Sequence, residues 1–357
     1  MKIIRDIEKL GEAHKNAVIA LGNFDGFHLG HRAIIAHAAE IAKAKNLPLT
    51  LMTFEPHPRE FFAKDKLGMR IYSLHSKLKI AHELGVEKVF LLRFNADFAS
   101  LGAEEFIREV LVKKLSANHI ITGENFCFGK DRKGDKDFLG KFADDLGFAY
   151  TAHPHIDDAD GKAVSSSTIR DFLAQGKMQE ANKLLGKNYH IEGKVKHGKK
   201  RGQTIGFPTA NLALKKLFLP RFGVYAVRVT VKLNNFYADF SLSSDRHPAL
   251  DAGSDDKTTD GIYSPRPRGK HGVTTSLSME NNLVYNAVAN LGIKPTFGVF
   301  APVLEVHIFD FAGDLYGKRI CVEFIDFIRD EQKFVDLDSL KKQIENDCNT
   351  AKAIQKT

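Results

Sequence analysis

The sequence predicts two units in tandem: a parallel, doubly wound α/β sheet, then a small antiparallel β-barrel or sandwich that ends in a helix. In residues 1–185, short apolar runs alternate with stretches of helical spacing, as in βαβ units. In residues 186–357, β-branched and alternating runs are separated by glycine and proline turns. The chain has 357 residues, and single cores usually stop growing near about 250–300 residues. We therefore predict one domain over 1–185 and a second over 186–357.

The first predicted strand runs directly into a turn and a helix. Residues 17–21 are apolar and bounded by Gly22, which predicts a buried strand. Residues 23–26 have turn chemistry, and helical spacing continues from Phe27 to about Lys45. A helix that starts after such a turn presents unpaired backbone N–H groups and the positive end of its dipole. We therefore expect an anion to bind at this junction.

Two histidines lie at the start of the predicted helix. His28 and His31 are three residues apart, so they share one face of the first turn. Two imidazoles in this place can donate hydrogen bonds to a phosphoryl group that gains charge during a reaction. Gly30 between them leaves room for a flat base or a sugar. A metal pair or two chance surface histidines are the alternatives, but the buried strand and the Gly-x-Phe-Asp turn favour a phosphate site.

Further strands and helices continue the alternation. Strands are predicted at 49–54, 88–92, 119–122 and 148–152, and helices at 73–84 and 103–115. Such alternation implies a parallel sheet, in which ligands lie beyond the carboxyl ends of the strands. The loops that follow the second and fourth strands are therefore candidate binding loops.

Aromatic side chains and one amide mark these two loops. His57 and Phe62 follow the second strand, and Asn125 and Phe128 follow the fourth. The rings could cover a planar ring system, while Asn125 supplies both a donor and an acceptor. Core packing in a short helix stays open as the alternative for Phe61 and Phe62.

A hydroxyl-rich turn opens a later helix of the first unit. Ser166 lies in this turn, and Arg170 follows one helical turn later. Hydroxyls at a helix start commonly act as caps. Beside an arginine, they also suit the binding of a triphosphate.

The second unit is predicted to begin after the turn 186–188. Its strands are expected at 189–195, 222–232, 283–291, 303–311 and 320–329, and its closing helix at about 337–352.

A basic glycine loop and the segment after it carry the chemistry of the second unit. The loop contains Gly202 and Gly206 and can fold over phosphates, although most such loops are ordinary surface turns. Thr209 and Asn211 alternate onto one face of an extended segment, and their oxygens are hard ligands that suit Mg²⁺. Glu305 lies on an alternating strand and is either an exposed strand residue or a buried base for a hydroxyl that attacks ATP.

These motifs resemble two enzyme families. The run 22–31 resembles the signature of nucleotidylyltransferases with a His-x-Gly-His motif, which join a nucleoside monophosphate from a triphosphate to a phosphate acceptor. The loops at 56–58, 123–129 and 165–170 resemble those of bacterial bifunctional FAD synthetases. The second unit is similar to riboflavin kinase in the stretches 202–211, 223–226, 290–298, 304–307, 314–317 and 328–334.

The resemblance implies an enzyme that phosphorylates riboflavin with ATP and then adenylylates the FMN to give FAD and pyrophosphate, with Mg²⁺ as cofactor. In the Rossmann-like first unit, it implies that His28 and His31 stabilise charge at the α-phosphate. The other implied residues of that unit are Gly22, Asn23, Phe24, Gly30, Ser166 and Arg170 for ATP, and His57, Phe62, Asn125 and Phe128 for the flavin. In the barrel unit they are Gly202, Gly206, Thr209 and Asn211 for the nucleotide, with Thr209 and Asn211 at Mg²⁺ and Glu305 as base.

Residues 236–282 fit neither unit. The segment is polar, rich in glycine and proline, and bordered by a repeated Asn-Asn pair. It resembles peptides translated from palindromic mobile elements of some alphaproteobacteria. We expect this segment to be an insertion at a hairpin tip, where extra length is tolerated because the entropy cost of loop closure grows slowly with loop length. Its low apolar content predicts disorder. A functional binding loop is the alternative.

Two other functions stay open at this point. One is a kinase fused to a transferase with another phosphate acceptor, such as a pantetheine or nicotinate phosphate. The other is a basic RNA-binding protein, since the formal net charge is +8; yet the basic residues are spread out and no nucleic-acid motif is present, so we expect small-molecule partners. The oligomeric state is left open.

Composition favours a cytoplasmic enzyme. Cys127, Cys321 and Cys348 are odd in number and far apart, which is typical of reduced thiols rather than of a disulfide framework. The first residues lack the apolar core of a secretory signal, and no apolar run reaches the length of about 18 residues that a membrane span needs.

Overall fold

The computed structural model describes residues 1–8, 10–63, 68–158, 161–197, 206–214, 216–231, 241–242, 283–296 and 299–356. Side chains are described for these residues except 241–242, 294–296 and 299–301.

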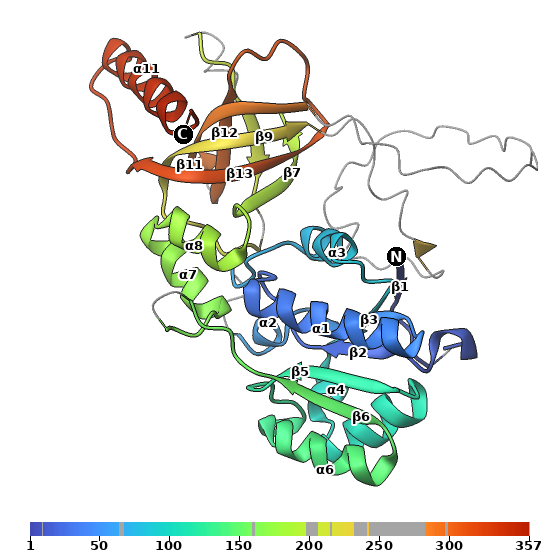
Figure 1. The fold of residues 1–357 in the computed structure, drawn as a ribbon. Helices are drawn as coiled ribbons and strands as arrows, with labels where there is room; N and C mark the ends of the chain where they lie inside the picture. The colour runs from blue at the N-terminus through green and yellow to red at the C-terminus, as the bar shows by residue number, and fades with distance from the viewer. Residues whose placement is uncertain are drawn as a thin grey trace, which may run out of the picture.

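A parallel sheet forms the N-terminal unit (Figure 1). The strand order is β10-β1-β4-β3-β2-β5-β6, and every neighbouring pair runs parallel. The predicted doubly wound α/β class is confirmed. The strands are β1 (Lys2–Ile4), β2 (Val18–Leu21), β3 (Leu49–Glu55), β4 (Lys88–Arg93), β5 (His119–Gly123), β6 (Ala149–His153) and β10 (Ser241–Leu242).

Helices cover both faces of this sheet because its strands alternate between two cores. In β2, Val18 and Ala20 join the core that contains α1 and α3, whereas Ile19 and Leu21 join the core that contains η2 and α6. The helices of the unit are α1 (Leu29–Lys45), α2 (Pro58–Phe62), α3 (Leu74–Glu83), α4 (Ala96–Ser100), α5 (Ala103–Glu105) with its π-helical continuation η2 (Phe106–Lys114), and α6 (Lys136–Leu146), with short 3₁₀ turns η1 (Glu12–His14) and η3 (Lys130–Arg132).

Two helices lie between the sheet and the second unit (Figure 1). Helix α7 (Ser166–Gln175) packs on α8 (Met178–Leu185), and α8 in turn contacts strand β13 of the second unit. Gly186 ends α8 in the left-handed conformation, with φ of 65°. One apolar core continues from the sheet through these helices into the second unit. The division at residues 185 and 186 therefore stays a prediction.

The second unit is a closed six-stranded antiparallel barrel. Of the two predicted architectures, barrel and sandwich, the structure has the barrel. Its order is β11-β12-β8-β7-β13-β9, closing from β9 to β11. The elements are β7 (His190–Lys196), β8 (Ala210–Ala213), β9 (Gly223–Val231), β11 (Leu283–Thr296), β12 (Val299–Ile308), β13 (Arg319–Arg329) and the final helix α11 (Leu337–Ile354).

Side chains that alternate along the strands fill the barrel interior on one face and pack against the last helix, α11, on the other. Tyr225 and Val227 of β9 point into the fully buried interior, while Ala226 points outward. On the outer face, Cys348 and Ala351 of α11 pack against this strand and β11. The C-terminal helix therefore covers one side of the barrel, as Figure 1 shows.

The predicted insertion at 236–282 lies almost wholly outside the described residues. The structure describes only Ser241–Leu242, whose backbone pairs in parallel with β1. These two residues therefore belong to the sheet of the N-terminal unit.

Candidate functional site

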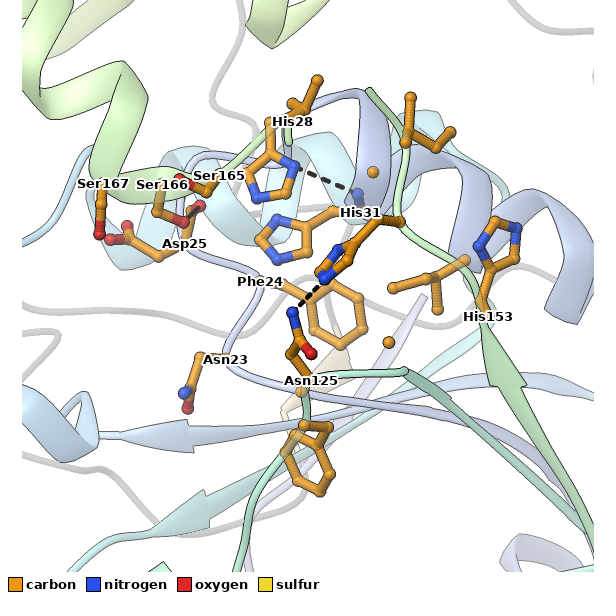
Figure 2. Close-up of a pocket in the computed structure, with 18 of the residues that line it drawn as sticks. Asn23, Phe24, Asp25, His28, His31, Asn125, His153, Ser165, Ser166 and Ser167 are labelled. Carbon is orange, nitrogen blue, oxygen red and sulfur yellow. Dashed lines mark hydrogen bonds between the residues drawn. The ribbon is translucent and has the colours of Figure 1, made fainter. Parts of the chain in front are cut away.

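A cleft of about 330 Å³ lies at the carboxyl ends of β2, β5 and β6, where the chain enters α1 and α7 (Figure 2). This is the edge at which open α/β sheets bind ligands. Many predicted site residues line the cleft together: Gly22, Asn23, Phe24, His28, Gly30, His31, His57, Asn125, Ser166 and Arg170.

The two helix-start histidines lie against each other in this cleft. Helix α1 begins at Leu29 rather than at Phe27, because Phe27 has φ of 44° and His28 is extended. His28 is therefore the N-cap, and its Nδ1 accepts the backbone N–H of His31 at 3.4 Å. The two rings stack with centroids 3.7 Å apart. Figure 2 shows both rings facing the cleft.

Burial keeps both imidazoles neutral. It lowers the pKa of His28 to about 4. It also holds the pKa of His31 well below the usual value, with the neighbouring His28 and Lys77 acting in the same direction. A neutral imidazole has one N–H donor and one acceptor nitrogen. The pair can therefore donate to phosphate oxygens without a proton being taken up first.

A buried lysine holds the turn between β2 and α1 in place. Lys77 of α3 donates from Nζ to the Asn23 carbonyl at 2.6 Å and to Thr53 Oγ1 at 3.3 Å. Burial lowers the pKa of Lys77 to about 8, although Asp25 and Glu55 oppose this change. Since the ammonium group has fixed acceptors, it fixes the path of the backbone between β2 and α1.

A buried carboxylate ties the turn to α7. Asp25 is 4% exposed, accepts the Ile71 backbone N–H at 3.0 Å and pairs with Arg170. Burial raises the pKa of Asp25, whereas Arg170 and Lys77 lower it. Ser166 Oγ donates to the Asp25 carbonyl at 2.8 Å. Asp25 was not among the predicted site residues, although it closes the Gly-x-Phe-Asp turn.

Arg170 is positioned by the protein itself. Besides Asp25, its guanidinium donates to the carbonyls of Met69 at 2.9 Å and Ser166 at 3.1 Å. Arg170 lines the cleft as predicted. Its contacts also join α7 to the turn at residues 23–26, which is a structural role. The sequence could not show this pairing, because the partners are far apart in the chain.

Of the predicted flavin residues, two lie in the cleft. His57 is the N-cap of α2, accepts the Arg59 backbone N–H at 3.1 Å and is 7% exposed. Burial, with Lys77 and other nearby cations, lowers its pKa to about 3. Asn125 lines the same cleft and contacts the ring of His155.

The other two predicted flavin residues lie elsewhere. Phe62 is 68% exposed and packs against Phe61 and Phe94, outside the cleft lining. Phe128 is buried in the sheet core against Phe106. Phe126 takes the place in the cleft lining that was predicted for Phe128. The loop is irregular, so spacing alone could not decide which ring points inward.

The lining also contains Arg59, His153 and His155, which were not predicted. His153 ends β6, and His155 follows it. The rule that ligands lie beyond strand ends pointed to this loop as well. Only the loops after the second and fourth strands had been predicted to bind ligand.

A second candidate site lies on the outer face of the barrel. Glu305 of β12 pairs in register with Asn211 of β8 on one side and with Asn290 of β11 on the other. Their neighbours Leu304 and Leu212 are fully buried in the interior, so the three polar residues face outward. Glu305 and Asn211 are half-buried, between the two alternatives that the sequence left open for Glu305.

The segment before β8 continues this face. Thr209 is half-buried, and its carbonyl accepts from Asn211 Nδ2 at 3.4 Å. His307 Nδ1 lies 2.9 Å from the Pro208 carbonyl. Gly206 is exposed with φ of 91°, which favours glycine. The prediction for Gly202 lies outside the described residues.

Two family models match the chain in tandem. Residues 10–168 match the model for FAD synthetase. Residues 185–355 match the model for riboflavin kinase. The first match ends in α7 and the second begins at the last residue of α8, so residues 169–184 lie between them.

Curated relatives match over nearly the full length. The bifunctional riboflavin kinase/FMN adenylyltransferase of Escherichia coli strain K12 is 37% identical, covering 99% of this chain and 97% of its own. The Bacillus subtilis protein of the same name is 36% identical, covering 95% and 93%. The Haemophilus influenzae protein, also of this name, is 34% identical, covering 99% of both chains.

A solved structure shares the whole architecture. It is described as a macrolide-efflux protein from Streptococcus pneumoniae, and it superposes with a TM-score of 0.75 at 30% identity over 98% of both chains. In the part of this chain that the structure describes, no helix combines the length and apolarity needed to cross a membrane.

The buried histidines predict a loss of stability in acid. Unfolded histidine takes up a proton near pH 6.5, whereas folded His28 and His57 do so only near about 4 and about 3. Between these values the unfolded state binds more protons, so the free energy of unfolding falls as pH falls. The shift at His28 corresponds to about 3 kcal/mol. Urea denaturation from pH 7 to 4 measures it.

The His28→Asn variant isolates this effect, since asparagine keeps the N-cap. We expect its stability to change less with pH than that of the wild type. His82→Asn, at an exposed position of α3, is the control and should follow the wild type. If the free energy of unfolding depended on pH equally in all three proteins, the loss of stability in acid could not be assigned to His28.

Proposed function

The chain belongs to the family of bifunctional riboflavin kinases/FMN adenylyltransferases, and on this premise we propose which residues carry each reaction. The C-terminal barrel unit phosphorylates riboflavin with ATP to give FMN and ADP. The N-terminal unit transfers the adenylyl group of a second ATP to FMN, which gives FAD and pyrophosphate. The assignment of residues below is our proposal.

In the N-terminal unit, we propose that His28 and His31 act on the α-phosphate of ATP. A phosphate oxygen of FMN attacks the α-phosphorus, and the bond to the oxygen that bridges to the β-phosphate breaks. Negative charge grows on the non-bridging oxygens and on the leaving pyrophosphate. Two neutral imidazoles at a helix N-terminus donate hydrogen bonds to such oxygens. The stacked pair, with His28 buried and His31 half-buried at the cleft, is the observation that carries this proposal.

Other lining residues hold the two substrates around this pair. The backbone of Gly22, Asn23 and Phe24 approaches from the strand end. Gly30 keeps the way to His28 open, because a Cβ there would lie 3.2 Å from His28 Nδ1. Ser166 and Arg170 close the triphosphate side from α7.

His57 and Asn125 face the cleft from the two loops that were predicted to border the flavin. We therefore propose that they contact FMN.

In the barrel unit, we propose that Glu305 is the base. A ribityl hydroxyl of riboflavin attacks the γ-phosphorus of ATP, and Glu305 accepts the hydroxyl proton as the bond to ADP breaks. The register of β12 and β8 places this carboxylate beside Asn211 on the outer face of the barrel.

Thr209 and Asn211 offer a hydroxyl and an amide oxygen next to that carboxylate, a hard oxygen set that fits Mg²⁺. We propose that they hold the ion, which when bound neutralises charge on the ATP phosphates. The chain's own residues then position the nucleotide and accept the proton.

We further infer that the chain works in the cytoplasm and takes small anionic substrates. Cys127, Cys321 and Cys348 are all free thiols, as is usual in a compartment where cysteines are kept reduced. The net charge of +8 suits nucleotide and flavin phosphates.

Separate residues predict separable activities. His28→Ala should slow FAD formation from supplied FMN by roughly 10²–10³-fold, the usual loss for one transition-state donor, while riboflavin phosphorylation continues. Glu305→Gln should slow phosphorylation by roughly 10²-fold or more and leave FAD formation from supplied FMN intact. Chromatographic separation of riboflavin, FMN and FAD measures both.

His82→Ala is the matched control and should leave both rates unchanged. If either active-site variant lost both activities while its circular dichroism stayed native, the division of labour would be wrong.

The magnesium proposal predicts a specific dependence. Thr209→Val removes one ligand oxygen at nearly constant volume, so we expect riboflavin phosphorylation to need roughly 10-fold more Mg²⁺ for half-maximal rate. Thr350→Val, at an exposed position of α11, should behave as wild type. Magnesium titrations of the initial rate provide the measurement, and an unchanged requirement in Thr209→Val would rule out this residue as a ligand.

A further inference from the structure

A buried cluster of metal-ligating side chains lies between the two units, away from both sites described above. His190 and Glu192 alternate on β7, and both point out of the barrel because Tyr189 and Ile191 point into it. Cys321 of β13 pairs in register with Glu192 and also faces outward. Helix α3 of the N-terminal unit covers this face with His75.

The cluster has the donors of a transition-metal site. One ligand atom each from His190, Glu192 and Cys321 lies within 4.8 Å of the others, and all three residues are buried. His75 Nε2 is 3.2 Å from Glu192 Oε2 and supplies a fourth donor. Tetrahedral zinc, with bonds of about 2.0–2.3 Å, needs donors roughly 3.3–3.8 Å apart. Small side-chain adjustments would bring the atoms of His190, Glu192 and Cys321 to that spacing, and His75, which lies outside this group of three but contacts Glu192, would have to turn toward it to complete the tetrahedron.

The surroundings orient the donors as protein metal sites usually do. The His190 ring stacks on Tyr72 with centroids 4.5 Å apart, and it is hydrogen-bonded to the backbone of Asn188. Metal-binding histidines commonly have one ring nitrogen fixed in this way. Lys79 Nζ is 3.3 Å from Glu192 Oε1. The carboxylate can keep this contact on Oε1 and bind a cation through Oε2.

We propose that His75, His190, Glu192 and Cys321 bind one divalent cation of the zinc class and thereby join α3 to the barrel. The thiolate and the imidazoles favour zinc over Mg²⁺, which prefers oxygen ligands. Binding releases the thiol proton to solvent and forms a sulfur–metal bond. The site would fix the two units relative to each other without taking part in either reaction. Without a metal, the same residues form only an interfacial ion-pair cluster.

Cobalt spectroscopy of the full chain tests the proposal. Chelator-treated protein receives Co²⁺ alone, with no nucleotide or flavin. We expect one Co²⁺ per chain, a sulfur-to-cobalt charge-transfer band in the near ultraviolet and tetrahedral bands in the visible. Zn²⁺ should remove these bands by displacement, and Mg²⁺ should not. No charge-transfer band at saturating Co²⁺ would overturn the proposal and leave the ion-pair cluster.

The three cysteines supply matched variants. Cys321→Ser should abolish the charge-transfer band. Cys348→Ser, a buried cysteine of α11 outside the cluster, should keep it, as should Cys127→Ser. A band that survives in Cys321→Ser, or that disappears in Cys348→Ser, would overturn the proposal.

A second variant, His190→Gln, tests the same proposal if Cys321→Ser fails to fold. His190→Gln should keep the thiolate band but weaken Co²⁺ binding at least about 10-fold. Zn²⁺ should raise the melting temperature of the wild type more than that of His190→Gln. Equal affinity and equal thermal shifts in the two proteins would contradict the proposed ligand set.

Discussion

A buried lysine under one turn is the interaction on which the N-terminal site depends. Lys77 is 6% exposed and donates to the carbonyl of Asn23, while Asp25 two residues later pairs with Arg170. Burying an isolated ammonium group or carboxylate is costly, so each needs fixed partners. Those partners lie on the turn itself, on β3, on α7 and just before α3, and satisfying them fixes the entry into α1. The stacked histidines then face a cleft that is lined by residues after β2, β3, β5 and β6 and at the start of α7.

The second site depends on a different constraint, the closure of the barrel. A closed sheet has no free register, because each strand is bonded on both sides. The alternation that buries Leu304 and Val306 therefore turns Glu305 outward, between Asn211 and Asn290. One site is thus built from loops held by buried charge, and the other from strand register.

Sequence reasoning succeeded where a pattern repeats and failed where tertiary contacts decide. The long strands and helices follow from their periodicity and the four-residue β2 from its apolar run, but β1 and β8, with three and four residues, show neither signal clearly. The Gly-x-Phe-Asp turn and the histidine pair could be found because their chemistry is local. The pairing of Asp25 with Arg170 joins residues distant in the chain, and the exchange of Phe126 for Phe128 depends on how an irregular loop packs. No local signal carries either.

The most direct test of the account follows the two histidines themselves. Nuclear magnetic resonance of the full chain, with the His28 and His31 imidazole signals assigned through single substitutions, is recorded while a non-hydrolysable ATP analogue and Mg²⁺ are added. The account predicts that both signals shift together on binding and that neither imidazole is protonated at neutral pH. Unchanged signals at saturating nucleotide, or charged imidazoles at neutral pH, would contradict it.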